Sequence, residues 1–221
     1  MDIFKNIDLR CLPLGELYAN CYLVSKAGAR DVVCIDPGAE AGKLLAELRD
    51  RDLSVETILL THGHADHIGA LNELRKAFPY AKVGVHHKDS VMLADPERNL
   101  STFLGEIITC DKPEMPLEDG EEFRSAGLAW KVIWTPGHTE GGSCYLATEP
   151  ESGENLLFSG DTLFHLSVGR TDFPGGSYQK LMDSLKDKLL TLPPETLVYP
   201  GHGEATSVKE EAAENPYVKS C

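Results

Sequence analysis

The stretch "LLTHGHADHIGA" (59–70) places three histidines and an aspartate within six positions, directly after an apolar run. His62 and His64 lie two positions apart in an expected extended turn, so their side chains point the same way. Asp66 and His67 begin the helix that we expect next, and they turn toward a different point. This one short segment can therefore supply ligands to two metal ions.

Composition and charge limit what kind of protein this is. The 221 residues are 42% hydrophobic, which is enough for a core, and we expect residues 1–221 to form a single domain. The 21 basic and 35 acidic side chains give a net charge of -14, which repels phosphate backbones and anionic membranes. We therefore expect neither nucleic acid nor a membrane as a partner.

The first residues carry no basic head followed by an apolar run, as an export signal would. No stretch approaches the roughly 20 apolar residues of a membrane-spanning helix. The six cysteines are scattered without a CxxC pair, so free and mostly buried thiols are expected. These features together predict a cytoplasmic protein of unknown oligomeric state.

Short apolar segments alternate with amphipathic ones along the chain, which predicts an α/β fold. Strands are expected within 32–36, 57–61, 82–86, 128–135, 155–160 and 196–200. Helical stripes are formed by Ala41, Leu44, Leu45 and Leu48; by Ile68, Leu71, Leu74 and Phe78; and by Tyr178, Leu181, Leu185 and Leu189. Ser207 and Glu210 form a capping box that predicts a last helix. Residues 95–122 lack a clean period and are expected to form a long loop with one helical turn.

Further polar residues follow the ends of other predicted strands. His138 follows the strand 128–135, Asp161 closes "LLFSGD" (156–161), and His202 follows "TLVY" (196–199). Open α/β sheets place ligands at the carboxyl ends of their strands, so we expect these residues to converge with the first cluster. Imidazole and carboxylate groups suit borderline cations such as Zn²⁺, and a bridging carboxylate holds two of them close together. The other histidines are expected to be structural or exposed: His86, His87 and His165.

The chain resembles the metallo-β-lactamase superfamily, and within it the short glyoxalase II-like hydrolases, over nearly its whole length. The resemblance rests on "THGHADHIGA" (61–70), "TPGHTEGGS" (135–143), "FSGDTLF" (158–164), "SVGRTDFPGGS" (167–177) and "YPGHGEAT" (199–206). It implies a four-layer αββα sandwich and two divalent metal ions, with zinc favoured and iron or manganese as alternatives. It further implies that one ion is held by His62, His64 and His138, the other by Asp66, His67 and His202, and that Asp161 bridges them.

Two departures from the family pattern bear on the substrate. Full-length glyoxalase II enzymes carry a C-terminal helical domain that helps to bind glutathione, whereas this chain ends soon after His202. Those enzymes also place tyrosines near the glutathione, where this chain has Asp172 and Glu204. Their basic residue survives as Arg170. Thioester hydrolysis therefore remains the expected activity, but the glutathione contacts do not transfer.

The expected reaction is hydrolysis of a thioester, with S-lactoylglutathione or a similar hydroxyacyl thioester as the substrate. A thiolate of pKa about 8.5 leaves without a general acid, whereas an amide nitrogen needs a proton donor. Asp66 is expected to orient the attacking water. Persulfide dioxygenation by a single iron and lactone hydrolysis are the alternatives. A catalytically inert binding module is disfavoured, because it has no use for seven ligands.

Arg170 has two interpretations. It can anchor a carboxylate of the substrate through two hydrogen bonds. It can also form a salt bridge to Asp172 that only shapes the loop.

Overall fold

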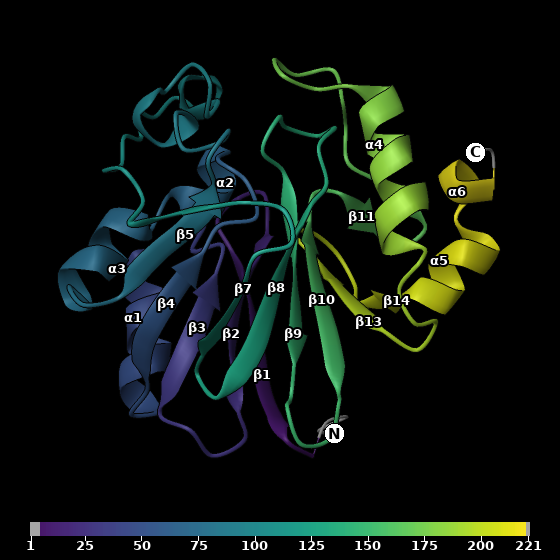
Figure 1. Ribbon diagram of the computed structural model, residues 1–221. Helices are drawn as coiled ribbons and strands as arrows, with labels where there is room; N and C mark the ends of the chain where they lie inside the picture. Colours follow the sequence, from purple (N-terminus) through teal and green to yellow (C-terminus); the bar gives the residue numbers. More distant parts are fainter. Residues whose placement is uncertain (1–4, 220–221) are drawn as a thin grey trace.

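Two six-stranded β-sheets pack face to face in the centre of the molecule, and helices cover the outer face of each (Figure 1). The computed structural model describes residues 5–219. The predicted four-layer αββα sandwich is therefore confirmed. Within the described part of the chain, no helix is both long enough and apolar enough to cross a membrane.

The first sheet has its strands in sequence order. They are β1 (Ile7–Leu14), β2 (Ala19–Lys26), β3 (Asp31–Ile35), β4 (Ser54–Leu59), β5 (Lys82–His86) and β6 (Met115–Leu117). Pairing is antiparallel from β1 to β3 and parallel from β3 to β6. The parallel strands β4 and β5 are buried on both faces along most of their length, which explains their continuous apolar runs.

The second sheet has the order β14-β13-β10-β9-β8-β7. Its strands are β7 (Glu122–Ser125), β8 (Leu128–Trp134), β9 (Ser143–Thr148), β10 (Asn155–Gly160), β13 (Leu197–Pro200) and β14 (Thr206–Ser207). Only β10 and β13 pair in parallel. The short strands β11 (Leu163–Phe164) and β12 (Ser167–Val168) form a separate ribbon. The parallel pair matters for function, because Asp161 and His202 follow its two strands.

Helices lie on both outer faces. The first sheet carries α1 (Ala41–Asp50), α2 (Ala65–Ile68) and α3 (Leu71–Ala77), and the second carries α4 (Tyr178–Ser184), the π-turn η3 (Leu185–Leu189), α5 (Val208–Glu214) and α6 (Pro216–Lys219). The 3₁₀ turns are η1 (Met92–Ala94) and η2 (Ser101–Leu104). Ser207 caps α5 by accepting a hydrogen bond from the Glu210 amide at 3.2 Å, so the predicted N-cap is confirmed.

The alternation of side chains along each strand divides the core into three apolar layers. On β2, Leu23 packs toward the first group of helices, whereas Tyr22 packs between the sheets. The central layer contains the largest fully buried side chains, Trp130, Tyr145 and Phe158. A rigid interior of this kind fixes the strand ends, and with them the loops that carry the polar residues.

Two local predictions differ from the structure, and a third is confirmed. Residues 115–117 form the edge strand β6 inside the segment predicted as a loop, because a three-residue strand is too short to show a period. The stripe from Ile68 to Phe78 is split into α2 and α3. The prediction of free and mostly buried thiols is confirmed for the described cysteines, since all five are free and only Cys11 is exposed, while Cys21, Cys34, Cys110 and Cys144 are buried. Cys221 lies outside the described residues.

Candidate metal centre

The segments that follow β4, β8, β10 and β13, including helix α2, meet at one place. They carry the seven residues that the sequence singled out: His62, His64, Asp66, His67, His138, Asp161 and His202. Their side chains fall into three overlapping groups, in each of which one nitrogen or oxygen per residue lies within 4.8 Å of the others. The structure thus brings together all seven predicted ligands.

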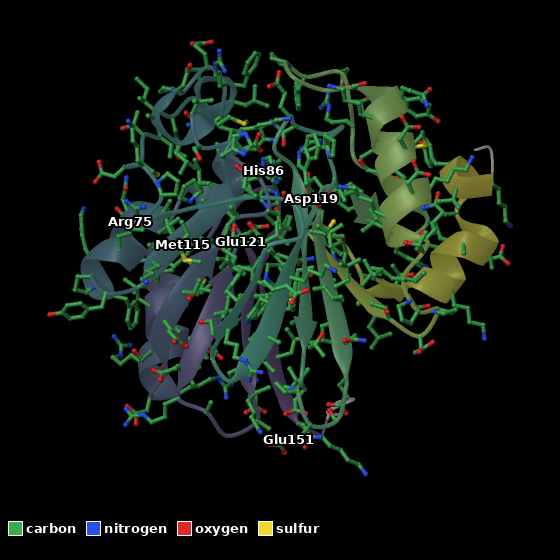
Figure 2. The ribbon with its side chains drawn as sticks, viewed as in Figure 1. Arg75, His86, Met115, Asp119, Glu121 and Glu151 are labelled. Atoms are coloured by element: carbon green, nitrogen blue, oxygen red, sulfur yellow. The ribbon has the colours of Figure 1, made fainter. Side chains whose placement is uncertain are left out.

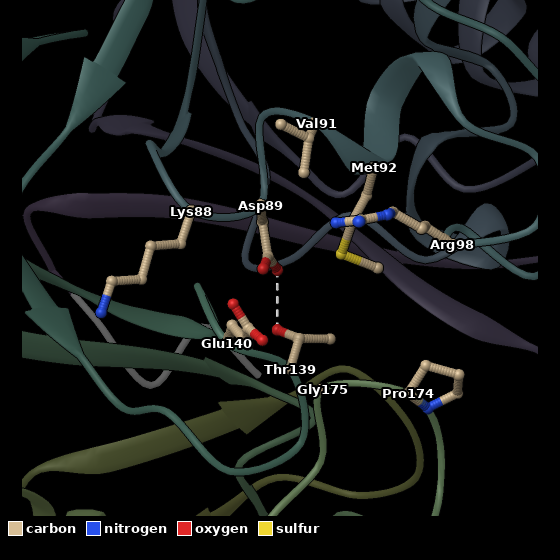
Figure 3. Close-up of a pocket in the computed structure, with 9 residues that line it drawn as sticks. All are labelled: Lys88, Asp89, Val91, Met92, Arg98, Thr139, Glu140, Pro174 and Gly175. Atoms are coloured by element: carbon tan, nitrogen blue, oxygen red, sulfur yellow. Dashed lines mark hydrogen bonds between the residues drawn. The ribbon is translucent and has the colours of Figure 1, made fainter.

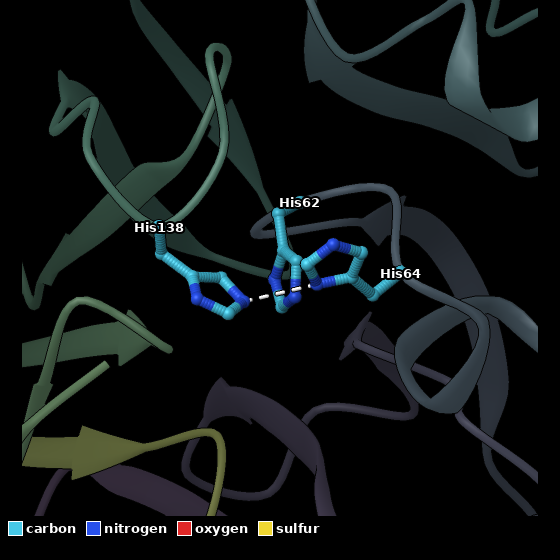
Figure 4. Close-up of side chains that lie close together, drawn as sticks. All are labelled: His62, His64 and His138. Carbon is cyan, nitrogen blue, oxygen red and sulfur yellow. Dashed lines mark hydrogen bonds between the residues drawn. The ribbon is translucent and has the colours of Figure 1, made fainter. Parts of the chain in front are cut away.

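The first group contains His62, His64 and His138, and all three are buried (Figure 4). Their ring centroids form a nearly equilateral triangle with sides of 4.7, 4.8 and 4.7 Å. The Nδ1 atom of His64 lies 2.9 Å from the Nε2 atom of His138. Three imidazoles that face one another in this way are suited to hold one cation.

The second group contains Asp66, His67 and His202. The Oδ2 atom of Asp66 lies 3.2 Å from Nε2 of His202 and 3.7 Å from Nε2 of His67. Asp66 and His202 are partly exposed, while His67 is fully buried. This group is therefore the more open of the two, and its carboxylate borders the cavity.

Asp161 lies between the two groups and contacts both. Its Oδ1 atom is 3.4 Å from Nε2 of His67, and its Oδ2 atom is 3.6 Å from Nε2 of His138. A side chain at Gly201 would occupy this place, since an added Cβ would lie 2.3 Å from Oδ1 of Asp161. The glycine after β13 thus makes room for a carboxylate that is placed to bridge two cations.

Several buried atoms of the cluster lack any hydrogen-bond partner among the described residues. They are the Nε2 atoms of His62, His64 and His67 and the Oδ1 atom of Asp161. Buried polar groups are nearly always paired, so four such atoms at one point indicate a missing ligand. Imidazole and carboxylate lone pairs that converge are what a divalent cation requires, so the residues fit two metal ions.

The charge states of His62 and His64 agree with metal binding. Burial, together with the neighbouring His67, holds the pKa of His62 well below its usual value. Burial and the nearby His138 lower the pKa of His64 to about 3. Both rings are therefore neutral at physiological pH, and a neutral ring nitrogen is the form that binds a metal.

The second group behaves differently because carboxylates surround it. Burial lowers the pKa of His67, but three neighbouring carboxylates outweigh burial and raise it to about 10. Those carboxylates belong to Asp66, Asp161 and Asp36. Burial would raise the pKa of Asp66, but His67 and His202 beside it hold that pKa below its usual range. The site is thus negative enough to favour a cation in place of the proton on His67.

Hydrogen bonds on the far side of the ring set the orientation of four of the five histidines. Asp36 accepts from Nδ1 of His67 at 2.9 Å and from the Thr61 hydroxyl at 2.7 Å. The Thr61 hydroxyl in turn lies 3.1 Å from Nδ1 of His62. The backbone oxygens of Arg170 and Leu17 accept from Nδ1 of two further rings, His138 and His202. Such partners occupy Nδ1 of these four rings and leave Nε2 for the metal, whereas Nδ1 of His64 is turned toward Nε2 of His138.

Sequence reasoning missed Asp36, although a signal was present. Asp36 ends the predicted strand "VVCID" (32–36) and so obeys the same strand-end rule as the other polar residues. Its backbone has a φ of 51°, in the left-handed region, and its side chain is buried. An aspartate tolerates this conformation better than most residues, and here it directs the carboxylate toward His67.

Asp89 was also missed, and it joins two of the loops that carry ligands (Figure 3). Its carboxylate accepts from the Thr139 hydroxyl at 2.7 Å, from the Gly141 amide at 2.6 Å and from the Gly63 amide at 3.3 Å. Gly63 lies between two ligands, and Thr139 follows His138. Burial raises the pKa of Asp89, although these three hydrogen bonds oppose that effect. The residue therefore positions the first group of histidines.

The two groups of candidate ligands border a cavity of about 410 Å³. It is lined by Leu17, His64, Ala65, Asp66, Asn99, Leu100, Phe103, Leu104, His138, Asp161, Arg170, Phe173 and His202. Arg170 forms two hydrogen bonds to Asp172, at 2.7 and 2.8 Å, and its guanidinium lies 3.9 Å from the centre of the Phe173 ring. The salt bridge expected as one interpretation of Arg170 is therefore present, in a residue that also borders the cavity.

The three histidines left outside the expected ligand set lie away from the cavity lining. His86 is buried, stacks on Trp134 and lies near Asp119 (Figure 2). Burial, assisted by His87, lowers the pKa of His86 to about 4. His87 pairs with Glu118 at 2.9 Å on the surface, and His165 lies 3.4 Å from Glu210.

Comparison with known proteins agrees with this geometry. The model of the metallo-beta-lactamase superfamily matches residues 14–202. The hydroxyacylglutathione hydrolase GloC of Haemophilus influenzae is 31% identical over 215 residues, which cover 97% of this chain and 99% of that protein.

Two solved structures agree in fold over nearly the whole chain. The BLEG-1 B3 metallo-beta-lactamase superimposes with a TM-score of 0.88 at 37% identity, covering 96% of this chain and 99% of that one. The protein TTHA1623, crystallised in a di-iron-bound form, gives 0.79 at 40% identity and covers 94% and 99%. The chain therefore belongs to the metallo-beta-lactamase superfamily.

Proposed function

We propose that the protein is a binuclear metal-dependent hydrolase of thioesters, with S-lactoylglutathione or a similar hydroxyacyl thioester as its substrate. The likeness to GloC, named a hydroxyacylglutathione hydrolase, supports this choice. The paired groups of ligands that share Asp161 support two metal ions. We propose zinc as the metal, with iron and manganese as alternatives, and the di-iron-bound form of TTHA1623 makes iron the first of these to test.

Two divalent ions, when bound, supply a water of lowered pKa as the nucleophile and polarise the carbonyl of the substrate. The protein holds the parts of this reaction in place. Asp161 fixes the spacing of the two ligand groups from between them. Asp66 is one-fifth exposed and borders the cavity, so its carboxylate can accept a hydrogen bond from the attacking water and orient it.

The observation that carries the proposal is the set of titratable residues in the cavity. Of those that line it in the described structure, every one except Arg170 belongs to the ligand groups. No separate acid is then available to protonate a leaving group. A thiolate leaves without one because its pKa is about 8.5, whereas an amine must be protonated. The cavity therefore favours thioesters over amides.

We further propose that Arg170 contacts the substrate. It borders the cavity, and a guanidinium binds a carboxylate through two parallel hydrogen bonds. Asp172 occupies those positions in the structure, so a substrate carboxylate would have to replace it. Exchange of one carboxylate for another changes the free energy little, so this contact adds orientation more than affinity.

A second candidate is β-lactam hydrolysis, which the likeness to the BLEG-1 B3 metallo-beta-lactamase favours. Both reactions use the same nucleophile and differ in the leaving group. Persulfide dioxygenation and lactone hydrolysis, which the sequence left open, are told apart from thioester hydrolysis by their products and by the consumption of oxygen.

The test combines metal analysis with a substrate panel on purified protein. The panel holds S-D-lactoylglutathione, a chromogenic β-lactam, a lactone and glutathione persulfide, the last with an oxygen electrode. We expect about two metal ions per chain and the highest kcat/KM on the thioester, and metal-free protein serves as the control. A single iron with oxygen uptake, or faster turnover of the β-lactam, would contradict the proposal.

A further inference from the structure

Apolar side chains surround the mouth of the metal cavity. We name this set the apolar rim: Leu17, Leu100, Phe103, Leu104 and Phe173. Phe103 is 76% exposed, and Leu17 and Leu104 are each about half exposed. Large apolar groups that gather at one cavity, rather than singly over the surface, indicate a binding surface.

The segment that presents three members of the rim is firmly held rather than loosely packed. The side-chain amide of Asn99, which is fully buried, donates to the backbone oxygens of Met92 at 3.1 Å and of Ile108 at 2.9 Å. These bonds close the loop at its base. The backbone oxygen of Asn99 accepts from the Ala65 amide at 2.8 Å, directly between the ligands His64 and Asp66. The rim is thus fixed to the metal centre by the backbone.

The turn itself is strained in a way that displays these side chains. Leu100 has a φ of 67°, in the left-handed region that a leucine rarely adopts. Strain of this kind persists where surrounding structure enforces it, and such sites are often functional. Here it begins the turn η2, which carries Phe103 and Leu104 out over the cavity.

The mouth of the cavity has little basic charge of its own. Arg170 is the only lysine or arginine among the described residues that line the cavity, and Asp172 already occupies its guanidinium. The carboxylates of Asp66 and Asp161 face the same space, but they belong to the ligand groups and would be offset by the cations. One carboxylate of a glutathione-like substrate can therefore bind here, in exchange for Asp172, and the apolar rim remains available to an apolar group.

We propose that the apolar rim binds an uncharged apolar group of several carbon atoms, attached to the thioester on either the acyl or the thiol side. The inference rests on the proposed thioester hydrolysis and names the class of substrate within it. Apolar surface that leaves water stabilises the complex in proportion to the buried area, and the exposed ring of Phe103 offers the largest part of that area.

The first experiment measures kcat/KM along two neutral series. Acetyl to octanoyl thioesters of N-acetylcysteamine vary the acyl side, and acetyl thioesters of ethanethiol to octanethiol vary the thiol side. We expect kcat/KM to rise about twofold for each added methylene in one series, half of the roughly fourfold expected for full burial, because the rim is partly open. Constant values along both series would overturn the proposal.

Matched variants assign the effect to the rim. Phe103→Ser should reduce the ratio of kcat/KM for the longest to the shortest substrate by about fivefold or more. Ile107→Ser is the control, because Ile107 is 79% exposed on the same segment and does not line the cavity. A ratio that falls equally in both variants would contradict the role of the rim.

A binding measurement separates this inference from the proposed function. The S-octyl and S-methyl thioethers of N-acetylcysteamine lack the carbonyl, and calorimetry gives their affinities without turnover. One outcome is that the octyl compound binds more tightly than the methyl compound, that Phe103→Ser weakens this binding, and that the protein hydrolyses no thioester. This outcome would support the apolar rim and refute the thioester proposal. If the two compounds bind with equal affinity and the protein does hydrolyse thioesters, the thioester proposal is supported and the role of the apolar rim is refuted.

Discussion

The loop contacts of Asp89 lead to a prediction that separates stability from metal binding. The change is Asp89→Asn, which keeps the shape of the side chain but turns one acceptor oxygen into an NH₂ donor. That donor is tolerated best at the Oδ2 position, because the Thr139 hydroxyl can accept from it. The hydrogen bond from the Gly63 amide, at 3.3 Å, is then lost, and this bond holds the loop between His62 and His64.

Two effects on stability nearly cancel in this variant. The lost hydrogen bond costs about 1 to 2 kcal/mol. The raised pKa of Asp89 shows that its buried charge is unfavourable, and the amide removes that charge. We therefore expect the free energy of unfolding of the metal-free protein to change by less than about 1 kcal/mol. Asp89→Ala, which leaves three buried donors without an acceptor, should cost about 3 to 5 kcal/mol.

Metal affinity should respond more strongly than stability to Asp89→Asn. Loss of residues that orient metal ligands costs 10- to 100-fold in affinity, and we expect a decrease of about tenfold, because only one of two ligand groups is affected. Competition with a chromophoric chelator measures the affinity, and thermal unfolding measures the stability.

The matched control for Asp89→Asn is Glu149→Gln. Glu149 is another buried carboxylate, and it accepts from the amides of Glu151 and Ser152 at 2.9 and 2.6 Å. Glu151, whose amide is one of these two donors, lies at the opposite end of the molecule from His86 (Figure 2). This control should leave metal affinity unchanged. An unchanged affinity in Asp89→Asn as well, or equal losses in the two variants, would refute the reasoning.

Three further predictions follow from the same site. Asp161→Ala should lower the metal content from about two ions to one or fewer per chain, because both ligand groups contact this carboxylate. Elemental analysis measures the metal content, and two retained ions would contradict the bridging role. Arg170→Ala should lower kcat/KM by at most about fivefold for an anionic thioester and by less for a neutral one. Asp172→Asn should raise kcat/KM for the anionic thioester relative to the neutral one. Equal losses on both substrates in Arg170→Ala would show that Arg170 only shapes the loop. The folded pKa of Asp89 lies above its unfolded value, so the folded wild type takes up a proton as the pH falls through that raised pKa. The wild type should then gain stability relative to Asp89→Asn in acid, and denaturation of both proteins from pH 7 to 4 checks the sign.

The candidate ligands could be predicted from the sequence because strand ends obey a simple rule. A buried strand must stop where its apolar run stops, and polar residues that follow several strands meet at one edge of the sheets. His138 and His202 carry little information alone, but their positions after β8 and β13 fix where they lie. Asp36 obeys the same rule at the end of β3 and could have been included.

Contacts made through the backbone left no trace in the sequence pattern. The oxygens of Leu17 and Arg170 that orient His202 and His138 depend on how distant loops fold back. The hydrogen bonds of Asp89 likewise reach the amides of Gly63 and Gly141, which lie 26 and 52 residues away along the chain. The same limit applies to β6, which is held by its pairing with β5 more than by any period of its own.

The order of the strands has a consequence for how the molecule can be divided. The chain passes from one sheet to the other only once in the described structure, between the end of β6 at Leu117 and the start of β7 at Glu122. A break at that crossing would yield two fragments with one whole sheet each. The first would carry His62, His64, Asp66 and His67, and the second His138, Asp161 and His202. Each ligand group draws residues from both fragments, so neither fragment alone contains a complete group. Metal binding would therefore require the two fragments to reassemble, and it could serve as the measure of their reassembly.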